Sequence, residues 1–309
     1  MESIMHEILS RFINKKKGEA KWVEELPAII AASARRWNLR IEAPLSEDYV
    51  EMSYSYIAAA TRMDGREVIL KIGSHDAQGG LSQTERDALR LCNGQGTVEL
   101  LDDDEELGVL LLERVRPGIP LGTQPDDAEN TRIAARMMRK FWQPVAAEHV
   151  FRPTADEIEG FDRLRQRFGG TTELLPEKWV RRAETLYEEL MASSTESVVL
   201  HGDLHHWNIL RAEREPWLVI DPKGLVGDPG YEVGAFLANH PDESCKGRDR
   251  RELVVSRVNV MAEELDISRE RIIKWGIVLA LIWARWAVSS DDDGWRPSIE
   301  RAEILESML

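Results

Sequence analysis

Apolar and polar residues follow one period at the start of the chain and a different one beyond residue 48. WVEELPAIIAASARRWNL, residues 22–39, has apolar side chains at helical spacing and predicts an amphipathic helix within a helical first forty residues. Residues 48–61 are instead rich in tyrosine, serine and small or β-branched residues, and residues 67–72 follow as a strand. Because Asp64-Gly65 is centred in the turn between them, the pattern predicts a β-hairpin.

Helix and strand signals continue to residue 115. SQTERDALRLC, residues 82–92, predicts a helix that begins with Ser82 and Glu85 in a capping-box arrangement and ends before two glycines. Two further strands are expected at residues 98–101 and 108–115, joined by an acidic turn at residues 102–106.

The remainder of the chain has a different texture. Pro117, Gly118 and Pro120 break the chain, and the rest is mostly helical except around residues 198–224. Strands followed by helices predict an α+β fold with two lobes. We expect a β-rich N-lobe at residues 1–116 and a helical C-lobe at residues 117–309, with the hinge at residues 113–118.

The most apolar segment of the chain does not indicate a membrane span, and the N-terminal segment does not indicate a secretory signal. WGIVLALIWARWAV, residues 275–288, is shorter than a membrane span and contains Arg285, so we predict a buried core helix. The N-terminus lacks the uninterrupted apolar core of a secretory signal. Cys92 and Cys245 lie far apart and form no CxxC, which indicates neither a disulfide framework nor a zinc site. We therefore expect a cytoplasmic protein.

Charge narrows the class of partner. The 309 residues include 55 acidic and 40 basic ones, for a formal net charge of -15. This balance argues against nucleic acid, which requires basic surfaces, and favours a cationic small molecule. Acidity that serves solubility alone would give the same balance. The sequence leaves the oligomeric state open.

A polar sequence directly after an apolar run carries the candidate chemistry. HGDLHHWNIL, residues 201–210, contains Asp203 and Asn208 five residues apart, and Asp221 follows the apolar strand 217–220. Upstream, Lys71 lies on a predicted strand and Glu85 on the helix after it. A loop aspartate with an asparagine five residues on, a later metal-binding aspartate, and an upstream lysine–glutamate pair together form the signature of kinases.

Phosphoryl transfer explains these residue types, because it requires positioning and charge neutralisation. We predict that Asp203 accepts the proton of the attacking hydroxyl. Asn208 and Asp221 supply hard oxygen ligands for Mg²⁺. Lys71 contacts the α- and β-phosphates of ATP, and Glu85 holds Lys71 in place.

HGDLHHWNIL followed by VIDPKGLVGDPGYEVGAFLANH resembles the aminoglycoside phosphotransferases, in particular the branch of streptomycin 6-phosphotransferase and hydroxyurea phosphotransferase. LPAIIAASARRWNL and LLLERVRPG are also similar to that branch, so the resemblance covers most of the chain. It implies a protein-kinase-like bilobal fold with ATP between the lobes. It also implies that the backbone from Glu113 to Val115 binds adenine, without choosing between ATP and GTP.

The chain departs from the kinase pattern at the phosphate-binding loop. Residues 51–56, where a glycine-rich loop belongs, contain no glycine. Backbone N–H groups can still approach phosphate there, and we expect Ser53 or Ser55 to add a hydroxyl.

Several polar residues near the signature have two interpretations. We expect His201 to support the loop, and His205 and His206 to make packing and polar contacts because no third metal ligand has suitable spacing. Lys223 either contacts phosphate or pairs with Asp203 or a surface acid.

The acceptor side of the site is less determined. Asp228 and Glu232 either line the acceptor pocket, where carboxylates bind ammonium or guanidinium groups, or cap the helix that begins near Tyr231. Residues 291–293 are more simply a solvated acidic loop than a substrate lining. Trp275, Trp283 and Trp286 share helical spacing and are expected in the core.

Two classes of function remain open at this stage. The first is an ATP-dependent phosphotransferase acting on a hydroxyl of a small molecule, with streptomycin-type aminoglycosides or hydroxyurea as acceptor. A metabolic sugar or amino-alcohol kinase has the same chemistry. The second is a pseudokinase that binds nucleotide without turnover, which only the glycine-free loop favours.

Overall fold

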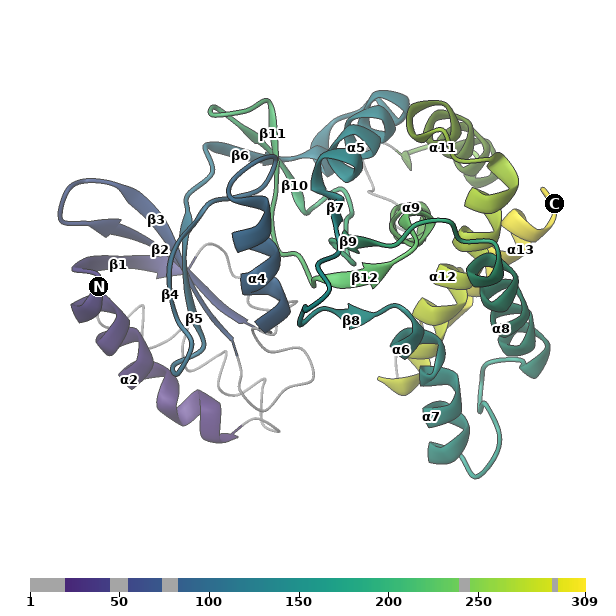
Figure 1. The fold of residues 1–309 in the computed structure, drawn as a ribbon, viewed down its shortest axis with the longest axis horizontal. Coiled ribbons are helices and arrows are strands. Elements are labelled where there is room, and N and C mark those ends of the chain that lie inside the picture. The colour runs from purple at the N-terminus through teal and green to yellow at the C-terminus, as the bar shows by residue number, and fades with distance from the viewer. Residues whose placement is uncertain (1–19, 45–54, 74–82, 239–244, 291–293) are drawn as a thin grey trace. The chain divides into compact units, whose positions relative to one another are not determined.

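A computed structural model describes residues 20–44, 55–73, 83–238, 245–290 and 294–309. The chain divides into two compact units, residues 1–116 and 117–309 (Figure 1). Unit 1 contains the antiparallel sheet β1-β2-β3-β5-β4 and two described helices. Their bounds are α2 Ala20–Arg36, β1 Leu39–Pro44, β2 Ser55–Arg62, β3 Glu67–Gly73, α4 Gln83–Cys92, β4 Leu100–Asp104 and β5 Val109–Glu113.

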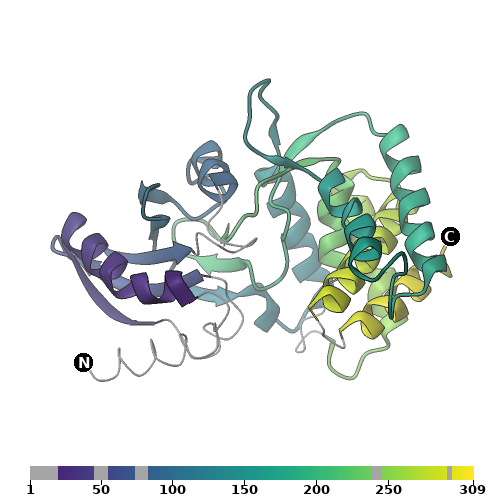
Figure 2. The same ribbon diagram turned by 90° about the horizontal axis from the view of Figure 1, so that it is seen from below.

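The hairpin of β2 and β3 confirms the predicted turn. Gly65 has a φ of 86°, and the Asp64 side chain accepts a 3.0 Å hydrogen bond from the Arg66 N–H. Val68, Leu70 and Ile72 of β3 are buried in one cluster with Leu26 and Ile29 of α2. Side chains alternate across a strand, so Lys71 points to the opposite face of the sheet. Figure 1 and Figure 2 show α2 and α4 on opposite sides of this sheet.

The ends of several elements differ from the predictions. The first helix ends at Arg36, because Asn38 adopts a left-handed φ of 52° and the chain continues as β1, a strand the sequence did not indicate. The predicted capping residue Ser82 and the helical region 1–19 lie outside the described residues.

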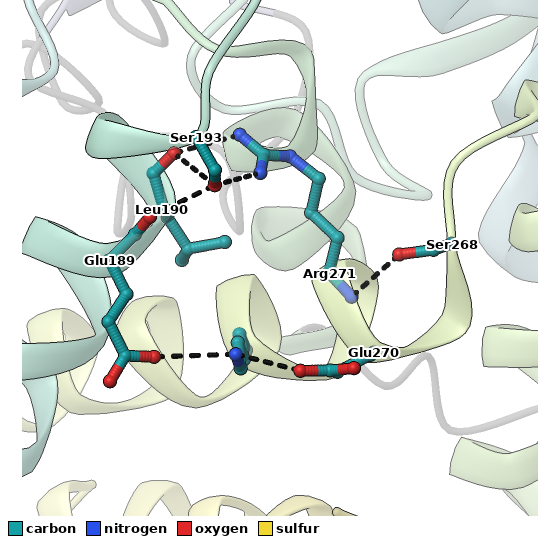
Figure 3. Close-up of a pocket in the computed structure, with 7 residues that line it drawn as sticks. Glu189, Leu190, Ser193, Ser268, Glu270 and Arg271 are labelled. Atoms are coloured by element: carbon teal, nitrogen blue, oxygen red, sulfur yellow. Dashed lines mark hydrogen bonds and ion pairs between the residues drawn. The ribbon is translucent and has the colours of Figure 1, made fainter.

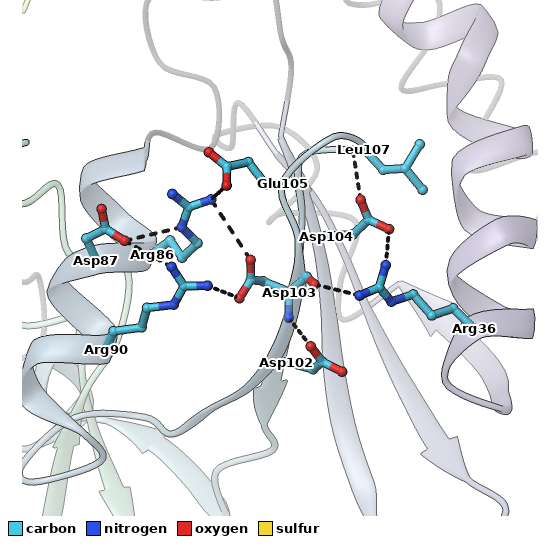
Figure 4. Close-up of polar contacts among 9 residues, drawn as sticks. All are labelled: Arg36, Arg86, Asp87, Arg90, Asp102, Asp103, Asp104, Glu105 and Leu107. Atoms are coloured by element: carbon cyan, nitrogen blue, oxygen red, sulfur yellow. Dashed lines mark hydrogen bonds and ion pairs between the residues drawn. The ribbon is translucent and has the colours of Figure 1, made fainter.

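The acidic run expected to form a turn is largely strand. It extends β4 to Asp104, and arginines from two helices bind it (Figure 4). Arg36 of α2 donates to Asp104 at 2.7 Å, and Arg90 of α4 donates to Asp103 at 2.6 Å. These ion pairs connect helices to the edge strand, which a solvated turn would not do.

Unit 2 is mostly helical with two small sheets, β11-β10-β6 and β7-β9-β12-β8. Its strands are β6 Pro117–Pro120, β7 Gln143–Pro144, β8 Arg152–Pro153, β9 Val198–Leu200, β10 Ile209–Ala212, β11 Trp217–Val219 and β12 Leu225–Gly227. Its helices are the 3₁₀ turn η1 Leu121–Thr123, α5 Asp127–Phe141, α6 Ala155–Ile158, α7 Gly160–Arg167, α8 Glu177–Ala192, α9 Pro229–Ala238, α11 Arg250–Leu265, α12 Arg269–Ser289 and α13 Trp295–Glu306.

Helix α12 forms the core of unit 2. It packs against α8, α9 and α13 (Figure 1). Among the described helices it alone is long and apolar enough to cross a membrane, yet 72% of its apolar stretch is buried inside the protein. The prediction of a core helix is confirmed. Ser268 caps its first turn by accepting a hydrogen bond from the Arg271 N–H.

Candidate active site

In unit 1, the predicted lysine and glutamate form a buried ion pair. Lys71 Nζ of β3 lies 2.7 Å from Glu85 Oε1 of α4, and both side chains are less than a tenth exposed. The alternation of β3 turns Lys71 away from the apolar cluster and toward the face on which α4 packs. The ammonium is therefore held by a helix carboxylate, in the arrangement that phosphate-binding lysines of kinases use.

In unit 2, the predicted catalytic loop connects β9 to β10. Gly202 has a φ of 82°, and a Cβ at this position would come within 2.8 Å of the Leu225 side chain. Both the backbone angle and the close contact require glycine. The sharp turn brings Asp203 to the surface, where a quarter of its side chain is exposed.

Asp203 is held as a carboxylate by a neighbouring cation. Its Oδ2 lies 3.1 Å from Lys223 Nζ. Burial acts to raise the pKa of the Asp203 carboxyl, but the positive charge of Lys223 and the hydrogen bond that its ammonium donates favour the carboxylate, and the pKa of Asp203 is lowered. An ionised carboxylate at a partly exposed turn can accept a proton from a hydroxyl group.

His201 supports the loop through both ring nitrogens. Nε2 donates to the Ile220 carbonyl at 2.8 Å, and Nδ1 accepts from the Asp203 N–H at 3.2 Å. The ring is fully buried, and burial lowers the pKa of His201 to about 4. A neutral ring with this tautomer satisfies both partners, which agrees with a supporting role.

Asn208 and Asp221 lie at the same end of the β10–β11 ribbon. The Ile220 N–H donates to the Asn208 carbonyl at 3.0 Å, so Asp221 directly follows the residue opposite Asn208. Asn208 Nδ2 donates to the Asp203 carbonyl at 3.0 Å, which leaves Oδ1 as its ligand atom. The backbone of Asp221 is left-handed, with a φ of 61°, and its side chain is exposed. An amide oxygen and a carboxylate fit Mg²⁺, which retains several waters as ligands.

Glu232 corrects the prediction of an acceptor-pocket carboxylate. It is fully buried at the start of α9 and accepts hydrogen bonds from the backbone of the loop. Oε2 accepts from the His201 N–H at 2.7 Å, and Oε1 accepts from Gly202 at 3.0 Å and Leu204 at 3.4 Å. Burial raises the pKa of Glu232 to about 7. Glu232 therefore shapes the catalytic loop from beneath and does not face a substrate.

Asp228 confirms the helix-capping alternative and not the acceptor-pocket one, because it immediately precedes α9 and its side chain accepts a hydrogen bond from the first turn of that helix. It is 4% exposed. Oδ1 accepts from Gly230 N at 2.8 Å and Trp275 Nε1 at 3.0 Å, while Oδ2 bonds to Ser194 and Arg271. Figure 3 shows Arg271 reaching from α12 to Ser193 and the Leu190 carbonyl of α8. These residues line a cavity of about 200 Å³ that none of the predicted site residues lines.

The sequence matches a known protein family over most of its length. A family described as "Aminoglycoside/hydroxyurea antibiotic resistance kinase" matches residues 46–294, a range that includes Lys71, Asp203, Asn208 and Asp221. The chain belongs to this kinase family. The predicted resemblance and the enzyme class, a small-molecule kinase, are therefore confirmed.

Curated relatives share about 30% of the sequence. Streptomycin 6-kinase of Streptomyces griseus is 30% identical over 287 residues, which cover 92% of this chain and 90% of that protein. Hydroxyurea phosphotransferase of Kitasatospora aureofaciens is 29% identical over 88% of this chain and 76% of its own. Both of these names describe phosphotransferases of small molecules.

Solved structures confirm the predicted α+β, protein-kinase-like fold. Choline kinase LicA from Streptococcus pneumoniae matches with a TM-score of 0.61 at 16% identity, over 92% of this chain and 99% of that one. A thermostable mutant of aminoglycoside phosphotransferase APH(4)-Ia, in a ternary complex with ADP and hygromycin B, matches with a TM-score of 0.61 at 13% identity, over 90% of this chain and 97% of that one.

The structure gives different outcomes for the residues predicted to bind adenine and phosphate. The Glu113 N–H donates to the Glu99 carbonyl at 2.9 Å, so this N–H is already used within unit 1. Val115 follows β5 and is half-buried. The adenine contact of the backbone from Glu113 to Val115 stays a prediction. Ser53 lies outside the described residues, and Ser55 is buried as the first residue of β2, which lends no support to a phosphate contact.

The remaining histidines and tryptophans separate into core and surface. His206 is buried and stacks on Phe236 with ring centroids 4.2 Å apart, while His205 Nδ1 accepts from the Trp207 N–H at 3.2 Å. No cluster of three potential metal-binding side chains occurs among the described His, Cys, Asp and Glu residues. Trp275 is fully buried as predicted, whereas Trp286 is 38% exposed and the core prediction is wrong for it.

Proposed function

We propose that this kinase transfers the γ-phosphate of ATP to a hydroxyl group of a streptomycin-type aminoglycoside. The observation that carries the proposal is the 30% identity with streptomycin 6-kinase over 92% of the chain. The net charge of -15 supports a cationic acceptor, because a negative protein attracts cations over long distances.

The chain's own residues divide the chemistry among them. Asp203 accepts the proton of the acceptor hydroxyl as its oxygen attacks phosphorus. Glu232 and His201 fix the backbone on which Asp203 stands. Lys71, held by Glu85, binds the α- and β-phosphates and orients the nucleotide.

Asn208 and Asp221 hold magnesium in this proposal. When bound, the ion neutralises phosphate charge that would otherwise repel the attacking oxygen. The two residues differ in kind, since Asn208 is less than a tenth exposed and fixed by its amide nitrogen, whereas Asp221 is exposed. Asn208 therefore supplies a rigid ligand and Asp221 the charge.

Hydroxyurea is the second candidate acceptor. The 29% identity with hydroxyurea phosphotransferase over 88% of the chain supports it nearly as well. Hydroxyurea carries no cationic group, so the charge argument favours the aminoglycoside. A metabolic sugar or amino-alcohol kinase would use the same catalytic residues, because these residues do not encode the acceptor.

An ADP-release assay tests the proposal. Magnesium-ATP is supplied with streptomycin, a second aminoglycoside or hydroxyurea as acceptor, and Asp203→Ala serves as the blank. Release that depends on streptomycin, with product mass increased by one phosphate, is the expected result. ADP release with hydroxyurea alone would identify hydroxyurea, and not an aminoglycoside, as the acceptor. Nucleotide binding without ADP release above the blank would indicate a pseudokinase.

A further inference from the structure

Lys223 occupies a position between the proposed base and an aromatic ring. Its Nζ lies 3.1 Å from Asp203 Oδ2 and 4.6 Å from the centre of the Trp286 ring. A third of its side chain remains exposed to solvent. All three residues belong to unit 2.

The backbone fixes Lys223 independently of its charge. The Lys223 N–H donates to the His201 carbonyl at 2.7 Å, and the Gly224 N–H donates to the same oxygen at 3.2 Å. The turn after β11 is thereby bound to the start of the catalytic loop. Removing the ammonium should leave these two hydrogen bonds, and so the loop, in place.

The ring of Trp286 is fixed from the other side. Its Nε1 donates to Glu157 Oε2 at 3.2 Å, and Arg285 donates to the same oxygen at 3.0 Å. Glu157 and Arg285 are both about nine-tenths buried, so their pair is a rigid support for the ring. A cation over an exposed tryptophan gains about 0.5–1 kcal/mol.

Phosphoryl transfer to a hydroxyl held by Asp203 would bring a phosphoryl group close to the carboxylate that Lys223 contacts. A hydroxyl that gives its proton to Asp203 lies about 2.6–3.2 Å from the carboxylate. The phosphorus it attacks lies about 3–3.5 Å further on. Lys223 Nζ lies 3.1 Å from the same carboxylate, so its long, flexible side chain would have the length to reach an oxygen of a phosphoryl group bound beside Asp203.

We propose that Lys223 is a catalytic residue that contacts the phosphoryl group in transit, and that Trp286 is the residue that positions its ammonium. The inference rests on the proposed phosphotransferase function. The bond from the acceptor oxygen to phosphorus forms, the bond from phosphorus to the ADP oxygen breaks, and the acceptor proton passes to Asp203. Lys223 keeps its protons and neutralises charge on the equatorial oxygens.

Substitutions of Lys223 test the first part. In Lys223→Met we expect kcat to fall by on the order of 10²-fold, as when one transition-state donor is removed. The KM of the acceptor and the dissociation constant of magnesium-ATP should change less than about threefold, because the contact forms in the transition state. Lys223→Arg should recover most of the lost rate, since it restores the charge.

Lys274→Met is the matched control. Lys274 is a partly exposed lysine of α12, paired with Glu270 at 2.8 Å and Glu189 at 3.3 Å, so its loss also breaks ion pairs in unit 2. Its kcat should equal that of the wild type. A Lys223→Met enzyme as fast as this control would overturn the inference, and a faster one would make Lys223 a blocking group on the base.

A double-mutant cycle tests the role of Trp286. Trp286→Leu alone should lower kcat about two- to fivefold, but it should have no further effect in the Lys223→Met background. Equal effects in both backgrounds would mean that Trp286 does not act through Lys223.

A wrong acceptor can be distinguished from a wrong role of Lys223. If no tested acceptor is phosphorylated, the same variants are compared in hydrolysis of ATP, where water replaces the hydroxyl. A slower hydrolysis in Lys223→Met than in Lys274→Met would support Lys223 while rejecting the acceptors. Hydrolysis at the level of the Asp203→Ala blank in every protein would reject both proposals.

Discussion

The carboxylate of Glu232, on helix α9, accepts a 2.7 Å hydrogen bond from the backbone N–H of His201 at the start of the catalytic loop. Two more loop N–H groups, from Gly202 and Leu204, point at its other oxygen. A buried carboxylate can satisfy several donors at once, which a hydroxyl or an amide cannot. The shape of the loop that presents Asp203 therefore depends on one side chain located about thirty residues further along the chain.

Glu232→Gln should weaken the loop while preserving side-chain volume. The amide offers one acceptor oxygen and turns its NH₂ group toward a backbone N–H, which leaves a buried donor unsatisfied at a cost of about 1–3 kcal/mol. We expect a lower free energy of unfolding and a kcat reduced about 10- to 100-fold. Urea unfolding and steady-state kinetics measure both. Glu270→Gln, an exposed glutamate of α12, is the control and should match the wild type.

Glu232 also predicts how stability depends on pH. Burial raises its pKa from 4.5 to about 7 in the folded protein, so the folded state holds this proton more tightly than the unfolded state. This tighter binding of the proton contributes up to roughly 3 kcal/mol to the free energy of unfolding. The contribution is fully present below pH 4.5 and is lost as the pH rises through about 7. Unfolding free energies at pH 5 and pH 8 should differ more in the wild type than in Glu232→Gln. Equal differences in the two proteins would count against this titration.

Asp221 should tolerate asparagine better than alanine. Its φ of 61° suits aspartate and asparagine, whereas alanine adds strain of about 1 kcal/mol. Both substitutions remove the carboxylate that we propose as the charged magnesium ligand, so we expect magnesium-dependent nucleotide affinity to fall in each. Only Asp221→Ala should also lower the melting temperature. Nucleotide titrations with magnesium and with EDTA separate the two effects, and an unchanged magnesium dependence would exclude Asp221 as a ligand.

Breaking the Lys71–Glu85 pair should destabilise unit 1. Lys71→Met leaves a buried carboxylate without its ammonium partner, which typically costs about 3–5 kcal/mol. The double variant Lys71→Met with Glu85→Leu removes both charges and should regain much of that stability, yet it should bind ATP no better. Thermal unfolding measures the stability of each variant, and nucleotide titration measures its affinity for ATP. A double variant that also regains affinity would show that Lys71 does not bind phosphate.

Local spacing was enough to predict the hairpin before Lys71, its partner Glu85 and the order of polar residues in the catalytic loop. These features depend on neighbours in the chain or on consecutive elements. The role of Glu232 was missed because hydrogen bonds to the His201 backbone leave no trace in the spacing of either residue. The only signal was an acid within the almost wholly apolar helix PGYEVGAFLA, where burial of a carboxylate implies nearby donors.

The strand β6 was also missed, because it contains two prolines. Pro117 and Pro120 suggested a break, but β6 is an edge strand of the sheet β11-β10-β6, where a residue without an N–H is tolerated. Asp228 was expected either in an acceptor pocket or as a helix cap, and the spacing could not indicate that Trp275 and Arg271 of α12 enclose it. In both cases the deciding partner lies far away in the sequence.

The position of β6 has a consequence for building chimeric kinases. Arg116 is bound to Glu67 of unit 1 by hydrogen bonds of 3.0 and 2.6 Å, and the next residue, Pro117, already pairs with Ala212 of β10. A recombination point between residues 116 and 117 keeps the hydrogen bonds of each unit within one parent. A crossover only a few residues later would graft a foreign edge strand onto the ribbon that carries Asn208, so a chimera joined at the first junction should be more stable than one joined at the second.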